Sequence, residues 1–239
     1  DDIKEDTELV TAVPEGIEDE DEQLEYDYGV MKTLSEKAAT TAFGPDRTII
    51  VRPTYMVGPA DKTNRFIHWP IRLSRGGETL VPGKEDDPVQ YLDVRDVAEF
   101  MIRLAEAGKT GAYNAVGPSG METIREFVTR ASAAFPVKTT PVYIDDYSFL
   151  REHSVYYLVP WIPTDGQNYG SSRISNTHAI AAGLTFRPLI DTMQETLIWW
   201  RSDAVSQEQR DKVEGDEKHL LQREGEVLTA WVEQVGVTD

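Results

Sequence analysis

Apolar residues follow two different spacings along the chain, and these spacings divide it into predicted strands and helices. Runs that are continuous or alternating predict strands, whereas repeats every three or four positions predict helices. The predicted strands cover residues 48–57, 89–94, 111–116 and 140–144. The predicted helices cover residues 28–43, 66–75, 96–105, 123–135, 176–182, 190–200 and 217–233, with an irregular segment at 1–25 and a turn-rich one at 78–88. Strands that alternate with helices are typical of an α/β fold.

Length and charge narrow the class of protein. A chain of 239 residues, 40% of them hydrophobic, can bury a full core as one domain or slightly more. The net charge of −18 argues against nucleic-acid binding, which needs clustered basic residues. Residues 1–27 hold thirteen acidic residues and one lysine, and we expect this leader to be a solvated loop. There is no cysteine, no signal-like segment and no long apolar run, so we expect a cytoplasmic protein that does not enter a membrane.

Tyr28 and Lys32 are the first candidates for chemistry. They lie four residues apart at the start of a predicted helix, so both side chains fall on one face. A phenol with its ordinary pKa near 10 is a poor acid or base at neutral pH, and a neighbouring cation favours its anion. The spacing alone is common by chance, so its meaning depends on the surrounding sequence.

The surrounding sequence supplies that context. Tyr-Gly-x-x-Lys at 28–32 is followed by Val-Arg-Pro-Thr-Tyr-x-Val-Gly-Pro at 51–59. Together they resemble the extended short-chain dehydrogenase/reductases, the NAD-dependent epimerase/dehydratase family. An acidic stretch at 5–9 and a closing block at 173–200 extend the resemblance from about Glu5 to Trp200.

The resemblance implies a Rossmann-type fold with a second lobe. Residues 1–60 and 86–117 would form the remaining back part of a doubly wound parallel sheet that binds NAD(P). Residues 61–85 and 118–239 would form a smaller α/β substrate lobe that ends in a C-terminal helix. The resemblance also allows a homodimer.

The resemblance implies roles for four residues. Tyr28 would donate or accept a proton at a hydroxyl or carbonyl of a small-molecule substrate, and Lys32 would be its electrostatic partner and bind the nicotinamide ribose. The backbone around Pro53 and Thr54 would contact the nicotinamide of NAD or NADP, at the carboxyl end of a strand, where α/β sheets bind ligands. No metal is implied.

Three further residues are candidates for the substrate side. They are Tyr55, Met56 and Arg95, although a core aromatic is the simpler interpretation of Tyr55 and a surface ion pair that of Arg95. Asp96 resembles a family signature but is expected only to cap a helix, with Glu99 three residues on. The aromatic-rich segment 145–161 could line a pocket or pack a core.

A part of the expected cofactor site is missing from the sequence. None of the 17 glycines forms Gly-x-Gly-x-x-Gly or Gly-x-x-Gly-x-x-Gly, the turn at which a backbone approaches a pyrophosphate. The family's catalytic Ser or Thr would also precede residue 1. We therefore expect a truncated or incompletely represented enzyme whose front half was removed, is disordered or lies on another segment. The chain alone is expected to be inactive.

Other chemistries have less support. The four histidines lack metal-ligand spacing, and no Gly-x-Ser-x-Gly elbow occurs. Two hypotheses remain. One is an NAD(P)-dependent oxidoreductase, epimerase or dehydratase acting on a small hydroxyl or carbonyl compound such as a nucleotide sugar. The other is a non-catalytic ligand- or protein-binding fragment on the same scaffold.

Overall fold

The computed structural model describes residues 2–236 and contains helices and strands in alternation. The helices are α1 Glu20–Phe43, α2 His68–Arg75, α3 Val94–Glu106, α4 Ile124–Ser132, α5 Tyr147–Glu152, α6 Thr177–Ala181, α7 Leu189–Trp200, α8 Gln207–Arg210 and α9 Leu220–Gly236. The strands are β1 Ile49–Pro53, β2 Tyr55–Val57, β3 Gly77–Pro82, β4 Pro88–Val89, β5 Tyr91–Asp93, β6 Gly111–Ala115, β7 Glu122–Thr123 and β8 Thr139–Ile144. None of the helices within residues 2–236 is long and apolar enough to span a membrane.

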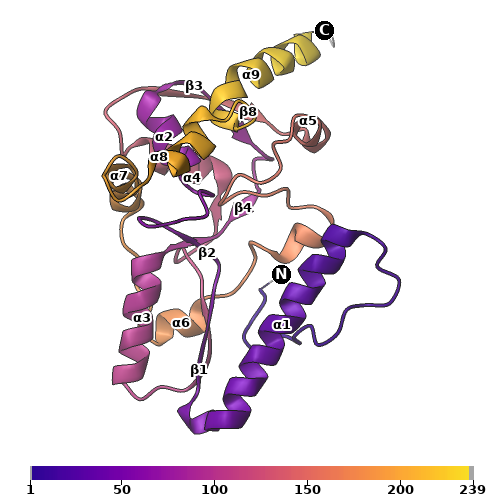
Figure 1. Cartoon of the computed structure of the whole chain (residues 1–239), viewed down its shortest axis with the longest axis vertical. Coiled ribbons are helices and arrows are strands. Elements are labelled where there is room, and N and C mark those ends of the chain that lie inside the picture. The colour runs from indigo at the N-terminus through magenta and orange to yellow at the C-terminus, as the bar shows by residue number, and fades with distance from the viewer. Residues whose placement is uncertain (1, 237–239) are drawn as a thin grey trace.

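Two parallel strand pairs form the lower part of the molecule in Figure 1. β1 pairs with β6, and Pro53 lies opposite Ala115. After Thr54 the chain continues as β2, which pairs in parallel with β5. Helix α3 connects β5 to β6, so these elements form a strand–helix–strand unit beside the β1–β2 segment. The predicted α/β class is therefore confirmed.

The upper part of Figure 1 is built around a third parallel pair, β3 with β8, together with helices α2, α4, α7 and α9. Its core is dominated by large side chains that are fully buried, among them Phe66, Trp69, Leu80, Phe127 and Trp161. A separate cluster fills the lower part between α3, α6 and the strands, with Leu92, Phe100, Leu104, Tyr113 and Leu184.

A buried ion pair fixes the last helix to the upper part. Arg72 of α2 donates to Glu224 of α9, and both side chains are less than 10% exposed, at 9% and 8%. Glu224 also accepts a hydrogen bond of 2.9 Å from the backbone N–H of Leu80 in β3. One carboxylate therefore joins α9 to both a helix and a strand.

The sequence prediction missed the start of one helix and the presence of one strand. Helix α1 begins at Glu20, inside the segment predicted to be irregular, because Asp19 caps it by accepting a hydrogen bond of 2.9 Å from the N–H of Glu22. The segment predicted as turn-rich at 78–88 contains strand β3, which pairs with β8 along its whole length. The strand at 48–57, which the sequence predicts to be broken by Pro53, is indeed divided at Thr54, because a proline lacks the N–H needed for a continuous ladder.

Two predicted caps were also wrong. Asp93, not Asp96, caps α3 by accepting a hydrogen bond of 2.9 Å from the N–H of Arg95. Asp96 lies in the first turn, is buried, and pairs with the guanidinium of Arg187 at 2.7 Å. For the short helix at 176–182 the sequence predicts Ser175 as the cap. Helix α6 instead follows Asn176, whose side chain forms no capping hydrogen bond.

Candidate active site

Tyr28 and Lys32 lie next to each other on α1, as their spacing predicts. The Nζ atom of Lys32 is 5.1 Å from the centre of the Tyr28 ring. Tyr28 is 58% exposed, so its hydroxyl is not enclosed in a core. A cation held against an accessible phenol is the arrangement expected for a tyrosine that exchanges protons with a bound molecule.

An ion pair places this helix face against β1. Glu36, one turn after Lys32, accepts two hydrogen bonds from the Arg52 guanidinium, of 2.8 Å and 2.7 Å. The chain descends along α1 and ascends along β1 in Figure 1. Since four helical residues rise about 6 Å, Lys32 lies beyond Arg52 in the direction of Thr54. Lys32 and Tyr28 therefore lie on α1 one turn and two turns before this contact.

Pro53 and Thr54 occupy the carboxyl end of β1. Pro53 is exposed, and the Oγ1 atom of Thr54 lies 3.4 Å from the carbonyl oxygen of Gln90. The chain therefore bends where β1 exchanges its neighbour β6 for β5 as β2 begins. Their predicted contact with a nicotinamide stays a prediction.

Tyr55 packs against the upper core on one side and takes part in a polar cluster on the other. Its ring meets the Tyr157 ring edge-on, with centroids 6.1 Å apart, and the guanidinium carbon of Arg65 lies 5.7 Å from its centre. Burial raises the pKa of Tyr55, and the adjacent Tyr157 adds to the effect. Tyr55 is therefore a neutral phenol at physiological pH. Met56, the next residue, is 41% exposed.

Arg65 and Tyr157 were not singled out in the sequence. Arg65 lies in the loop between β2 and α2, where no motif marks it. Tyr157 belongs to the aromatic-rich segment, whose members separate into two groups. Tyr147, Phe149 and Trp161 are buried in the core, whereas Tyr156 and Tyr157 are 55% and 49% exposed. Both alternatives for that segment, core packing and an accessible surface, therefore apply to different residues.

Arg95 joins two helices. It donates hydrogen bonds of 2.8 Å and 2.7 Å to Asp93 and also pairs with Glu195 of α7. Burial would raise the pKa of Asp93, but the hydrogen bonds from Arg95 bring that pKa below its ordinary value. Arg95 is thus engaged in ion pairs, the simpler of the two interpretations of this residue. Its contact with a substrate stays a prediction.

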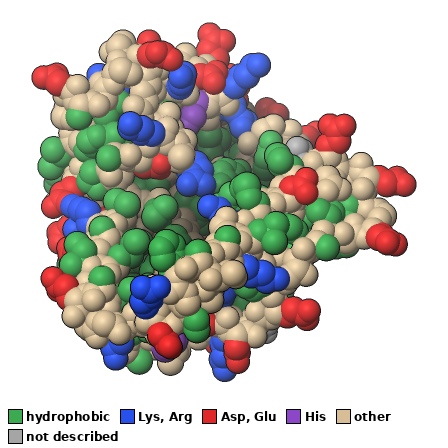
Figure 2. Space-filling view, turned by 60° about the horizontal axis from the view of Figure 1, so that its bottom comes forward, with side chains coloured by type: hydrophobic (Ala, Val, Ile, Leu, Met, Phe, Trp, Pro, Cys, Tyr) green, Lys and Arg blue, Asp and Glu red, His purple; other side chains and the backbone are tan. Residues whose placement is uncertain are grey.

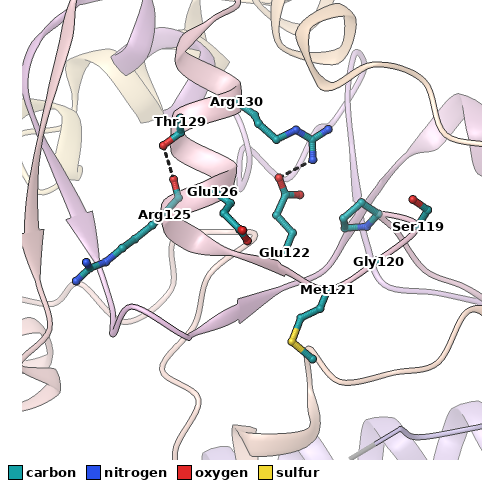
Figure 3. Close-up of a pocket in the computed structure, with 9 residues that line it drawn as sticks. Ser119, Gly120, Met121, Glu122, Arg125, Glu126, Thr129 and Arg130 are labelled. Atoms are coloured by element: carbon teal, nitrogen blue, oxygen red, sulfur yellow. Dashed lines mark hydrogen bonds and ion pairs between the residues drawn. The ribbon is translucent and has the colours of Figure 1, made fainter.

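A pocket lies at the N-terminus of α4, away from these residues (Figure 3). It has a volume of about 420 Å³ and is bordered by Met121, Glu122, Arg125 and Arg130. Glu122 is buried and accepts a hydrogen bond of 2.6 Å from Arg130 and another of 2.8 Å from the Tyr91 hydroxyl. Tyr91, Glu122 and Arg130 thus satisfy one another's hydrogen bonds, so these three side chains add no obvious reactive group to the pocket.

The face shown in Figure 2 is hollowed near its centre, with hydrophobic side chains around the hollow and acidic side chains mainly at the outline. No group of three or more metal-ligating side chains occurs among residues 2–236.

A comparison with known protein families found a match in the first half of the chain. Residues 8–116 match the NAD dependent epimerase/dehydratase family. Over these residues the chain is similar to that family. This confirms the predicted family over those residues. The comparison with curated proteins found no match.

Several solved structures resemble this chain. RMD from Pseudomonas aeruginosa, complexed with NADPH, is 18% identical with a TM-score of 0.49, over 82% of this chain and 64% of that one. A GDP-L-fucose synthetase from Naegleria fowleri is 17% identical with a TM-score of 0.49, over 84% and 64%. UDP-glucose 4-epimerase from Bifidobacterium longum, in complex with NAD⁺ and UDP, is 14% identical with a TM-score of 0.47, over 75% and 55%. The chain thus spans less than two thirds of these proteins.

Proposed function

We propose that this chain is the part of an NAD(P)-dependent epimerase, dehydratase or reductase that holds the proton-transferring tyrosine and one wall of the substrate cleft. The substrate would be a small molecule with a hydroxyl or carbonyl group, of the nucleotide-sugar class. The observation that carries the proposal is the Tyr28–Lys32 pair, with 5.1 Å between cation and ring, in a segment that matches the family.

Tyr28 would exchange a proton with the substrate oxygen. Its exposed hydroxyl can form a hydrogen bond to a bound molecule, and the ammonium of Lys32 lies 5.1 Å from the centre of its ring. The Glu36–Arg52 ion pair supports the same helix from β1 and so fixes the height of Tyr28 relative to Thr54. These are the tasks that the described residues can perform.

The residues present fit one end of NAD(P). Lys32 and the exposed segment at Pro53 and Thr54 could hold the nicotinamide and its ribose, and the cofactor would supply or accept hydride there. No glycine turn of the dinucleotide-binding type is present for the phosphates. We therefore infer that the pyrophosphate is held by residues outside this sequence.

The same proposal includes the division into lobes and the assembly. Residues 1–60 and 86–117 would complete a cofactor domain, and 61–85 and 118–239 a substrate lobe. The apolar clusters cross this division, because Val89 and Tyr91 pack in the upper core and Ala179 and Leu184 in the lower one. A cytoplasmic location is consistent with the absence of cysteine from the sequence. A homodimer is supported by Leu24, Met31 and Leu34, which lie on one side of α1 and are each more than half exposed.

The reaction class is tested with the full-length protein and a panel of UDP- and GDP-sugars. Each sugar is incubated with NAD⁺ or NADPH, and products are identified by proton NMR. We expect one sugar to be epimerised, dehydrated or reduced by the wild type. If no member of the panel reacts while the protein binds a sugar nucleotide, the alternative of a non-catalytic binding scaffold is favoured, an alternative supported by the missing glycine turn.

A further inference from the structure

Arg65 is held in a fixed position by residues from two distant segments. Its Nε atom donates to the Thr63 hydroxyl at 2.8 Å, and Nη1 donates to the Tyr157 hydroxyl at 3.3 Å. The guanidinium carbon lies 5.7 Å from the centre of the Tyr55 ring. Residues 65 and 157 are 92 positions apart, so this contact exists only in the folded protein.

The loop that carries Arg65 is itself constrained. Ala60 and Asn64 have φ values of +70° and +59°, which side chains other than glycine adopt infrequently. Asp61 accepts hydrogen bonds from both the N–H, at 2.8 Å, and the hydroxyl of Thr63. The Asn64 side chain accepts a hydrogen bond of 2.8 Å from Gln209. Unfavourable backbone angles stabilised by several contacts are typical of a preorganised functional loop.

Arg65 differs from the other arginines near the sheet in having no paired carboxylate. Arg52, Arg95 and Arg187 each form ion pairs with acidic side chains. Arg65 forms none with any acidic residue within 2–236, and its Nη2 atom has no hydrogen-bond partner there. The acidic groups that influence this cluster at longer range are Asp61, acting on Arg65, and Glu25, acting on Tyr55.

The cluster lies next to the carboxyl end of β1. Tyr55 follows directly on Thr54 there, and its ring contacts both Tyr157 and Arg65. We infer that Arg65 and Tyr157, with Tyr55 as a neutral supporting ring, bind an oxyanion of the substrate, a carboxylate or a phosphate. This inference rests on the proposed function, because it assigns the group to the substrate of that site.

The anion site is tested by NMR on the 239-residue chain, with the arginine Nε–Hε signals as the readout. Inorganic phosphate and acetate are titrated separately to distinguish the two sources of the oxyanion. We expect one of them to shift the Arg65 signal, and Arg65→Met to weaken binding about tenfold or more, because charge-assisted hydrogen bonds dominate such a site. Tyr157→Phe should weaken it about threefold. Asp61→Asn should strengthen it, since a like charge is removed.

The matched control is Arg151→Met, because Arg151 also lies over a tyrosine ring, that of Tyr147, at 5.6 Å, but pairs with Asp165. Its removal should leave anion binding unchanged. Tyr28→Phe should also bind the anion normally, so a failure of the catalytic assignment is distinguishable from a failure of this one. The inference is overturned if neither anion shifts the Arg65 signal, or if Arg65→Met and Arg151→Met have equal effects.

Discussion

Glu36 of α1 and Arg52 of β1 form a two-pronged ion pair, with distances of 2.8 Å and 2.7 Å between the guanidinium nitrogens and the two carboxylate oxygens. Arg52 also donates a hydrogen bond of 3.0 Å to the carbonyl of Glu5. One side chain therefore ties together the N-terminal segment, the helix of the candidate acid and the strand that ends at Pro53. The position of Tyr28 depends on this contact rather than on an apolar core, because most of α1 is exposed.

Glu36→Gln should destabilise the fold by about 1–2 kcal/mol, since it replaces a charge-assisted pair between side chains that are only 20% and 23% exposed. The measurement is the free energy of unfolding in urea. Glu208→Gln is the control, because Glu208 pairs with Lys212 on an exposed helix face, where the loss of an ion pair should change the free energy of unfolding much less. Equal effects of the two substitutions would show that the Glu36 pair does not anchor α1.

Glu224→Ala should loosen α9 and destabilise the protein by about 3–5 kcal/mol. The substitution leaves the buried guanidinium of Arg72 and the N–H of Leu80 without their shared acceptor. Hydrogen exchange measured by mass spectrometry should show faster exchange in 220–236 than in α1. A loss of less than about 1 kcal/mol would mean that α9 is held mainly by its apolar contacts.

Acid should destabilise the upper part of the molecule through His68. Its two ring nitrogens are buried without hydrogen-bond partners among the described residues, and burial lowers its pKa well below the ordinary value, with His219, Arg72 and Arg75 adding to the effect. A histidine with a lowered folded-state pKa contributes stability above pH about 6.5, and this stability is lost as the pH falls further. The loss should approach about 1.4 kcal/mol per pH unit.

The acid effect is measured as the free energy of unfolding between pH 7.5 and 5, an interval set by the reference value for histidine of about 6.5. His68→Leu should flatten the pH dependence, whereas His178→Gln, at a side chain that is 55% exposed, should not. Identical slopes for wild type and His68→Leu would refute the assignment. His219, whose pKa burial also lowers, is expected to account for part of any slope that remains.

The 239-residue chain should bind NAD⁺ and NADP⁺ weakly or not at all. Pyrophosphate contacts at a glycine turn supply much of the anchoring of a dinucleotide, and the sequence has no such turn. Calorimetric titration of the chain and of the full-length protein tests this expectation. Tight binding by the chain alone would contradict our account of the missing cradle.

Sequence patterns predicted those parts of the fold that depend on local spacing. The Tyr28–Lys32 contact follows from helical periodicity. The parallel pairing of β1 with β6 and of β2 with β5 follows from strand–helix alternation. Strand β3 was missed because Pro82 and the acidic turn after it obscure a short apolar run whose stability comes from β8. A pairing over more than fifty residues leaves no local signal.

The polar parts of the site were harder to predict for a related reason. Asp93 and Asp96 both precede suitable helical positions, but Asp93 caps α3 and Asp96 instead pairs with Arg187, a tertiary contact that local spacing does not reveal. Arg65 and Tyr157 come from separate loops and meet only in the folded protein. Residue type and spacing therefore identified the proton donor candidate but not Arg65 and Tyr157.

The central claim is that Tyr28 exchanges the proton during turnover, and it is tested most directly by kcat of the full-length protein carrying Tyr28→Phe. Tyr26→Phe is the matched control, because Tyr26 lies on the same helix but has Val30 rather than a lysine four positions on. We predict that Tyr28→Phe lowers kcat by about 10²–10⁴-fold with little change in cofactor affinity, while Tyr26→Phe stays near wild type. Unimpaired turnover by Tyr28→Phe would contradict the account.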